Sequence, residues 1–232
     1  MIKTEFLSVG LTRRETCWGL GYLAFQILFL PSFLSIACLL LPVELDNTRF
    51  NLLYMSINLL AAVLIFPRFL LSFFPVSGKK LLRILLVGAA FFVIYWLLNL
   101  CLSHLVVLIR PEFVNKNDQA VADMAEISYG LMFLGTVVLA PVTEEIFYRG
   151  LLLRGLYGRS PVAAWIVSVS VFGLIHVLGY LSVLSPLELL LSFLQYLPAG
   201  VCLAASYRLS GSLICPILIH AAINTVAILA LR

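Results

Sequence analysis

Two adjacent carboxylates and an arginine interrupt an otherwise apolar stretch of the chain. The segment LAPVTEEIFYRG places Glu144, Glu145 and Arg149 among side chains that would suit a helix in lipid. An ionisable side chain at membrane depth costs at least about 2.5 kcal/mol on insertion scales, so such residues indicate a functional site when they face protein or a water-filled cavity. Glu145 and Arg149 share a helix face and can form an ion pair. Glu144 lies about 100° further round the helix and can face a different partner.

Pro141 lies just upstream of this acidic pair. Because proline removes a backbone hydrogen bond, it should kink or loosen the helix where water would have to enter. The simpler interpretation is that Glu144, Glu145 and Arg149 form an interfacial cluster at the cytoplasmic end of a span. The motif alone leaves both interpretations open.

Two later pairs of residues weaken the simpler interpretation. Phe172 and His176 share one face of an apolar segment, and His220 and Asn224 share one face of another. A lone histidine in a membrane helix more often bonds a neighbouring helix than catalyses a reaction. We assign that structural role to His104, which has no polar partner at helical spacing.

Taken in order, these motifs resemble the pattern of the CPBP family, the CAAX-protease and bacteriocin-processing enzymes also called Abi proteins. Every motif position between about Leu139 and Thr225 is filled in the expected order. The resemblance implies an intramembrane endopeptidase, whereas residues 1–127 carry no matching motif and leave the substrate class open. The site residues that it implies are Glu144, Glu145, Arg149, Phe172, His176, His220 and Asn224.

Peptide-bond hydrolysis needs an activated water, donors for the developing oxyanion and a proton for the leaving amine. A carboxylate held among apolar helices suits a general base, and we expect Glu144 to fill that role. His176 can hold the same water and pass on a proton, with Phe172 packed beside it. His220 and Asn224 could supply the oxyanion donors. Arg149 would orient the two carboxylates through Glu145.

The same residues also allow a metal mechanism. His176, His220 and Glu144 would make a normal catalytic zinc set with one position open for water. The sequence lacks H-E-x-x-H, but a zinc site assembled from three helices needs no such motif. We favour a site without a cofactor and keep zinc as the alternative.

The elements around these motifs are typical of a polytopic membrane protein. Hydrophobic residues make up 62% of the chain and charged residues 11%, against about 25% charged in soluble domains. We therefore expect an all-α transmembrane helix bundle that forms a single membrane domain, 1–232, with spans one to three in 1–127 and catalytic spans four to seven in 128–232. Apolar runs of about 20 residues predict about seven spans, near 17–41, 52–74, 82–109, 128–150, 161–183, 187–208 and 212–231.

Basic residues predict the orientation of the bundle, because loops rich in Lys and Arg stay on the cytoplasmic side. We expect a cytoplasmic N-terminus in the plasma membrane of a bacterium or an archaeon. This bias explains the net charge of +4, so no nucleic acid partner is expected. The basic residues concerned are Lys3, Arg13, Arg14, Arg68, Lys79, Lys80, Arg83, Arg154, Arg159 and Arg208.

Straight helices would leave the two histidines at different depths. His176 would lie about 22 Å along span five, and His220 only about 12 Å along span seven. We therefore expect span five to tilt strongly or to begin outside the bilayer, and the site to open on a cavity in the cytoplasmic half.

A non-catalytic scaffold or a transporter would also retain Glu, Arg and His in its interior. The sequence shows no inverted repeat between its halves and no paired broken helices, which are the usual pointers to a secondary transporter. We therefore favour an endopeptidase. Its expected partners are the lipid bilayer and a peptide or membrane-anchored protein substrate.

Overall fold

The computed structural model describes residues 6, 10–41 and 44–231. Every regular element among these residues is a helix, which confirms the all-α fold class. The first half of the chain forms α2 (Arg13–Leu28), α3 (Leu30–Leu40), α4 (Asn47–Ile65), α5 (Pro67–Leu71), α6 (Gly78–Ile109) and α7 (Lys116–Ile127). The second half forms α8 (Tyr129–Phe133), η1 (Leu134–Leu139), α9 (Ala140–Glu145), η2 (Ile146–Arg154), α10 (Gly155–Tyr157), α11 (Pro161–Leu178), α12 (Pro186–Ser210) and α13 (Ile214–Leu229).

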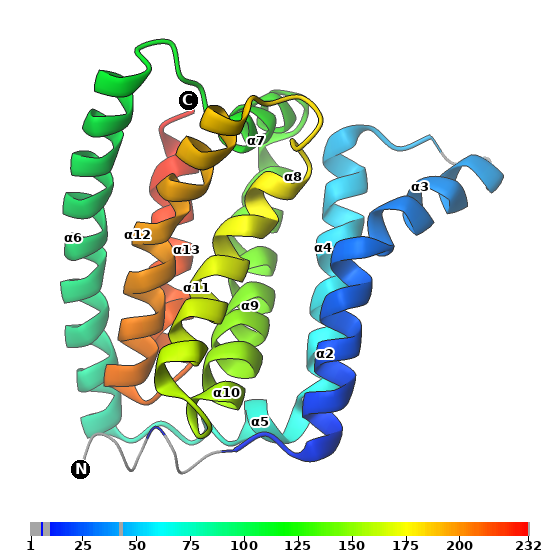
Figure 1. The fold of residues 1–232 in the computed structure, drawn as a ribbon. Coiled ribbons are helices and arrows are strands. Elements are labelled where there is room, and N and C mark those ends of the chain that lie inside the picture. The colour runs from blue at the N-terminus through cyan, green and yellow to red at the C-terminus, as the bar shows by residue number, and fades with distance from the viewer. Residues whose placement is uncertain (1–5, 7–9, 42–43, 232) are drawn as a thin grey trace.

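The helices form a polytopic bundle with each predicted span in place as a helix or a helix pair (Figure 1). Within the described residues, five helices are long and apolar enough to cross a membrane: α4, α6, the continuous helix Tyr129–Tyr157, α11 and α12. Helices α2 and α3 make a sixth crossing if their 60° bend is counted within one span. Helix α13 is shorter, at 16 residues, so a count of seven crossings stays a prediction.

Helix α3 leans away from the rest of the bundle (Figure 1). The break falls at Phe29, and Pro31 lies in the first turn of α3, where a missing N–H costs no helical hydrogen bond. Helix α2 itself is fixed to α4, because the Tyr22 hydroxyl donates to Asn58 Oδ1 at 2.9 Å. The first predicted span is therefore a helix packed on α4, followed by a bent apolar extension.

The helix Tyr129–Tyr157 carries the acidic motif through the centre of the bundle. Its turns widen to a π-helical form on both sides of α9, in η1 and η2. Pro141 lacks an N–H, and its ring crowds the carbonyl of Val137 four residues earlier, so a widened turn relieves the conflict. All nine residues of η2 are buried, and the segment packs against α11 and α2. π-Helical turns are frequent at functional sites.

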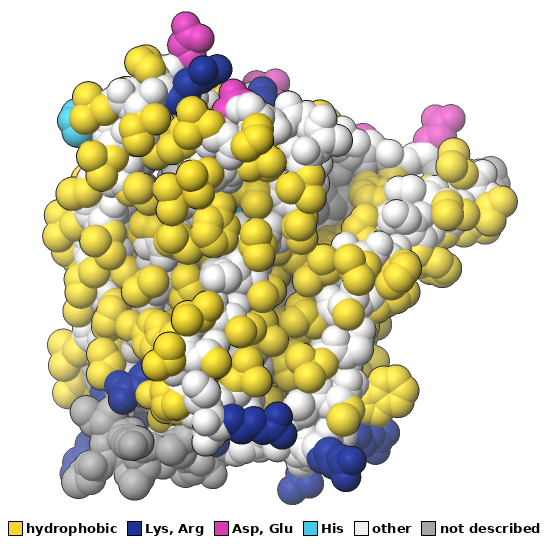
Figure 2. All heavy atoms as spheres, in the orientation of Figure 1, with side chains coloured by type: hydrophobic (Ala, Val, Ile, Leu, Met, Phe, Trp, Pro, Cys, Tyr) yellow, Lys and Arg dark blue, Asp and Glu magenta, His cyan; other side chains and the backbone are white. Residues whose placement is uncertain are grey.

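The surface of the bundle separates its charges. Lys and Arg side chains gather at the end where α5 and α10 lie, and most visible Asp and Glu side chains lie at the opposite end (Figures 1 and 2). Hydrophobic side chains cover the surface between these ends (Figure 2). The exposed large hydrophobic residues include Leu39, Leu86 and Val162. This distribution agrees with an integral membrane protein, and the assignment of the basic end to the cytoplasm stays a prediction.

Candidate active site

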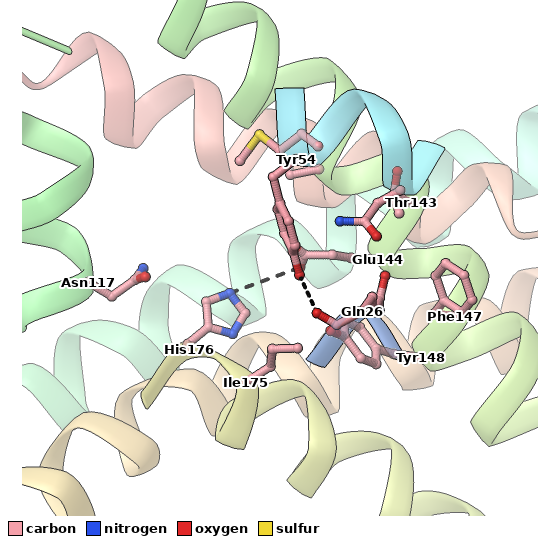
Figure 3. Close-up of a pocket in the computed structure, with 12 residues that line it drawn as sticks. Gln26, Tyr54, Asn117, Thr143, Glu144, Phe147, Tyr148, Ile175 and His176 are labelled. Carbon is pink, nitrogen blue, oxygen red and sulfur yellow. Dashed lines mark hydrogen bonds and ion pairs between the residues drawn. The ribbon is translucent and has the colours of Figure 1, made fainter. Parts of the chain in front are cut away.

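Three helices bring Glu144, His176 and His220 to one point. Glu144 is the second-to-last residue of α9, His176 lies near the C-terminal end of α11, and His220 lies in the first half of α13. The Oε2 atom of Glu144 lies 4.0 Å from Nε2 of His176 and 4.0 Å from Nε2 of His220. Figure 3 shows Glu144 and His176 facing each other across a cavity. The two histidines therefore meet at the same depth, although straight helices would have separated them.

The Nδ1 atoms of the two imidazoles are held by neighbouring acceptors. Nδ1 of His176 lies 2.7 Å from the carbonyl oxygen of Phe172, which can only accept a hydrogen bond. Nδ1 of His220 lies 2.9 Å from Oε1 of Glu145. A neutral imidazole that donates through Nδ1 carries its lone pair on Nε2, so both lone pairs face Glu144.

The carboxylate of Glu144 completes a set of three acceptor atoms. Its Oε2 atom is buried and has no hydrogen-bond partner among the described residues. Two imidazole lone pairs and a carboxylate oxygen cannot bond one another directly, so the point between them suits a hydrogen-bond donor or a cation. The side chains remain partly accessible, at 24% for Glu144 and 17% for His176.

Glu145 and Arg149 form the ion pair that their spacing predicts. Their side chains are fully buried, and Nη1 of Arg149 lies 3.1 Å from Oε1 of Glu145. Nη2 of Arg149 also donates to the carbonyl of Gly200 at 3.2 Å. The same Glu145 oxygen accepts from His220, so a chain of contacts runs from Arg149 through Glu145 to His220.

Phe172 packs against both histidines. Its ring lies edge-on to His220, with centroids 5.8 Å apart, and packs against His176 at 4.9 Å. The guanidinium of Arg149 lies 4.4 Å from the centroid of the same ring, a cation–π contact. The aromatic ring therefore links the ion pair to the histidines, and it packs beside His176 as expected from the sequence.

Asn224 lies along α13, one turn after His220, and lines the same cavity as Glu144. Its Nδ2 group donates to the carbonyl of Thr136 at 2.8 Å, which fixes the amide and leaves its second N–H for another acceptor. Thr136 belongs to η1, so the widened turns before α9 help to position this amide.

Two cavities meet at Glu144 and His176. The smaller has a volume of about 220 Å³ and lies between α4, α9 and α11, with Tyr54 and Tyr148 in its wall (Figure 3). The larger has a volume of about 650 Å³ and contacts His220 and Asn224 as well. Its volume is typical of a ligand-binding pocket.

The larger cavity reaches the end of the bundle opposite to the one expected. Residues of α7, the second half of α6 and the last turns of α13 are among those that line it, including Ser103, Met124 and Ile228. These segments lie away from the end where the basic side chains gather (Figures 1 and 2). The expectation of a cavity in the half near the basic connections is therefore wrong. His176 lies near the C-terminal end of α11, and α7, which packs against α4, closes part of the cavity at that end.

The residues proposed for zinc do not form an assembled ligand set. Within the described ranges, no group of three or more His, Cys, Asp or Glu side chains is placed to hold a metal ion. The donor atoms of His176, His220 and Glu144 are of types that zinc accepts, and both histidines have partners at Nδ1, as zinc ligands often do. Zinc bound by these residues stays an alternative hypothesis.

Several residues of the site carry no motif in the sequence. The ring of His176 stacks on Tyr196 at 4.2 Å, and the Tyr196 hydroxyl donates to Asp118 Oδ1 at 3.2 Å. Tyr196 occurs in an apolar span without a charged neighbour, and Asp118 lies in the polar stretch between spans three and four. One signal in the sequence could have indicated a helix that carries Asp118. Asn115 is a favoured N-cap residue, and its side chain accepts hydrogen bonds from two backbone N–H groups at the start of α7.

The motif-bearing half of the chain matches a known family. Residues 126–226 match the family model described as type II CAAX prenyl endopeptidase Rce1-like. The matched family is one of endopeptidases, and the apolar helices fit an integral membrane protein. The match confirms the resemblance that the motifs suggested for this part of the chain. Comparisons with curated proteins and with solved structures gave no match.

Proposed function

We propose that the protein hydrolyses a peptide bond in a membrane-associated peptide or protein, with Glu144 activating a water molecule. The observation that carries this proposal is the convergence of Glu144 Oε2 and two histidine Nε2 atoms, each 4.0 Å from the carboxylate oxygen. A water placed between these acceptors can donate to Glu144 and to one imidazole, and its oxygen lone pair then points away from both. That arrangement suits attack on a carbonyl carbon.

The proton inventory of the reaction follows from these contacts. Glu144 takes a proton from the attacking water as the new C–O bond forms, and the carbonyl oxygen becomes an oxyanion. When the C–N bond breaks, the proton passes from Glu144, directly or through His176, to the departing amine. One carboxylate therefore serves first as base and then as acid, and the site returns to its starting state.

Two groups are suited to stabilise the oxyanion. Asn224 has a second N–H that the Thr136 carbonyl does not use. His220 can donate through Nε2 when it is protonated, and its Nδ1 atom is held 2.9 Å from Oε1 of Glu145. Arg149 acts as a positioning residue, because it holds Glu145 without reaching the cavity.

We propose a site without a metal ion and keep zinc as the competing mechanism. His176, His220 and Glu144 would be its ligands, as judged from their donor atoms. Elemental analysis separates the two, and its expected result is given below. We further propose a bacterial or archaeal plasma membrane as the location, with the N-terminus in the cytoplasm.

Mass spectrometry of peptide termini can test the activity without a known substrate. Membranes of cells that express the wild-type protein should contain new peptide termini, which should be absent from cells that express Glu144→Gln. Glu126→Gln is the matched control, since Glu126 is exposed at the end of α7 and lines neither cavity. New termini that persist in Glu144→Gln membranes would contradict the proposal.

A further inference from the structure

The lining of the larger cavity combines a carboxylate on α7 with several aromatic rings. Asp118 lines the cavity together with Tyr95, Trp96, Tyr180 and Tyr196, and the rings of Tyr95 and Trp96 pack edge-to-face with centroids 5.2 Å apart. The Tyr196 hydroxyl donates to Asp118 Oδ1 at 3.2 Å, and the carboxylate lies within electrostatic range of Tyr95 and Tyr180. The Asp118 side chain keeps access to the cavity. We call this group of residues the Asp118 pocket.

The charge of the cavity has one sign. Of the described residues that line it, Asp118 and Glu144 are acidic, two are histidines, and none is Lys or Arg. Asp118 forms no ion pair with a basic residue in the described part of the chain. The basic residue nearest to it on α7 is Lys116, whose charge acts on Glu188, and Arg110 lies 3.6 Å from the same glutamate. The negative charge of Asp118 is therefore left for a ligand.

A carboxylate among aromatic rings is suited to an organic cation. An ammonium or guanidinium group can pair with the carboxylate, while the faces of tyrosine and tryptophan attract the same positive charge. An anionic group, such as a free C-terminal carboxylate, would meet two like charges and no basic partner. The pocket thus discriminates by charge as well as by shape.

We propose that the Asp118 pocket is a specificity site for a lysine or arginine side chain of the substrate. This inference rests on the proposed function. The pocket adjoins the proposed catalytic point, because the ring of His176 stacks on Tyr196 with centroids 4.2 Å apart. A substrate held there would place its cationic residue on the α7 side of the scissile bond. Residues in the smaller cavity would contact the other side of the chain.

Binding of a simple probe tests this assignment without any need for cleavage. The full chain carrying Glu144→Gln, in dodecyl maltoside micelles, is titrated with N-lauroyl-lysine amide and with N-lauroyl-norleucine amide. The Glu144→Gln background prevents hydrolysis and removes the second negative charge. The Kd of each probe is compared between protein variants in the same micelles, so the partition of the probe into the micelle cancels from the ratio of the two Kd values.

The lysine probe should bind about tenfold more weakly after Asp118→Asn is added, which corresponds to the loss of about 1.4 kcal/mol. The norleucine probe should bind both proteins equally. Asp118→Asn keeps the shape of the side chain and an acceptor for the Tyr196 hydroxyl, so the fold should persist. Asp118→Glu should retain the preference for lysine. The matched control is Asp123→Asn, because Asp123 is exposed on the same helix, bonds Gln119 and lines neither cavity.

Three results would overturn the proposal: equal binding of the lysine probe with and without Asp118, an equal loss with Asp123→Asn, or displacement of the probe by equimolar phosphatidylcholine. The last would assign the pocket to a lipid headgroup. Failure of the proposed function would appear differently, as peptide cleavage that continues in Glu144→Gln, and would leave the binding result unchanged.

Discussion

The buried pair Glu145–Arg149 supports a quantitative prediction about stability. Arg149→Met should destabilise the protein by about 3–5 kcal/mol, because it leaves the carboxylate of Glu145 buried without its cation. Methionine fills much of the same volume, so the loss is electrostatic rather than a large cavity. The Gly200 carbonyl and the ring of Phe172 lose their contacts with the guanidinium as well.

A double variant separates the isolated charge from the other losses. Glu145→Gln combined with Arg149→Met removes both charges, and it should recover most of the stability that Arg149→Met loses. The measurement is the free energy of unfolding in mixed micelles of dodecyl maltoside and SDS, followed by circular dichroism. An Arg149→Met protein within about 1 kcal/mol of the wild type would refute the reasoning, since a typical buried pair loses more.

Three further outcomes are expected. Purified active protein should contain no stoichiometric zinc and should survive strong chelators; one zinc per chain, with activity lost on its removal and restored on its return, would establish the competing mechanism. Asn224→Ala should lower kcat by about 10²–10³-fold with little change in KM, as for loss of one oxyanion donor, and an unchanged kcat would remove Asn224 from that role. Desolvation raises the pKa of Asp118 above its ordinary value, so the folded state favours the protonated carboxyl group. The stability that this group contributes is fully present at a pH below the ordinary pKa, and it is lost as the pH rises through the raised pKa. Asp118→Asn should therefore match or exceed the wild type in Tm at neutral pH, with a difference that shrinks on acidification, whereas a lower Tm at neutral pH would show that the charged form stabilises the fold.

The helices and the faces of the motif residues could be predicted from the sequence. Apolar length located the predicted spans, although not the polar helix α7, and spacing of four residues placed Glu145 with Arg149 and Phe172 with His176. These features depend on local geometry and on the cost of burying charge, which a single sequence expresses directly.

The depth and surroundings of the site could not be predicted in the same way. The return of α7 over the bundle depends on contacts between segments far apart in the chain, such as Thr48 Oγ1 donating to the Met124 carbonyl at 2.9 Å. Likewise, the residues next to Glu145 in the sequence do not indicate that Oε1 of Glu145 contacts both Arg149 and His220. The division of the chain at residues 127 and 128 and the roles of the site residues stay predictions.

The central claim is that Glu144 activates the attacking water. Its most direct test is the rate of a single turnover of a substrate found among the new membrane termini, measured with wild-type protein and with Glu144→Gln in the same micelles. The rate should fall by at least about 10²-fold, the usual contribution of a general base, while circular dichroism and Tm stay those of the folded protein. A folded Glu144→Gln protein that turns over within tenfold of the wild-type rate would contradict the claim.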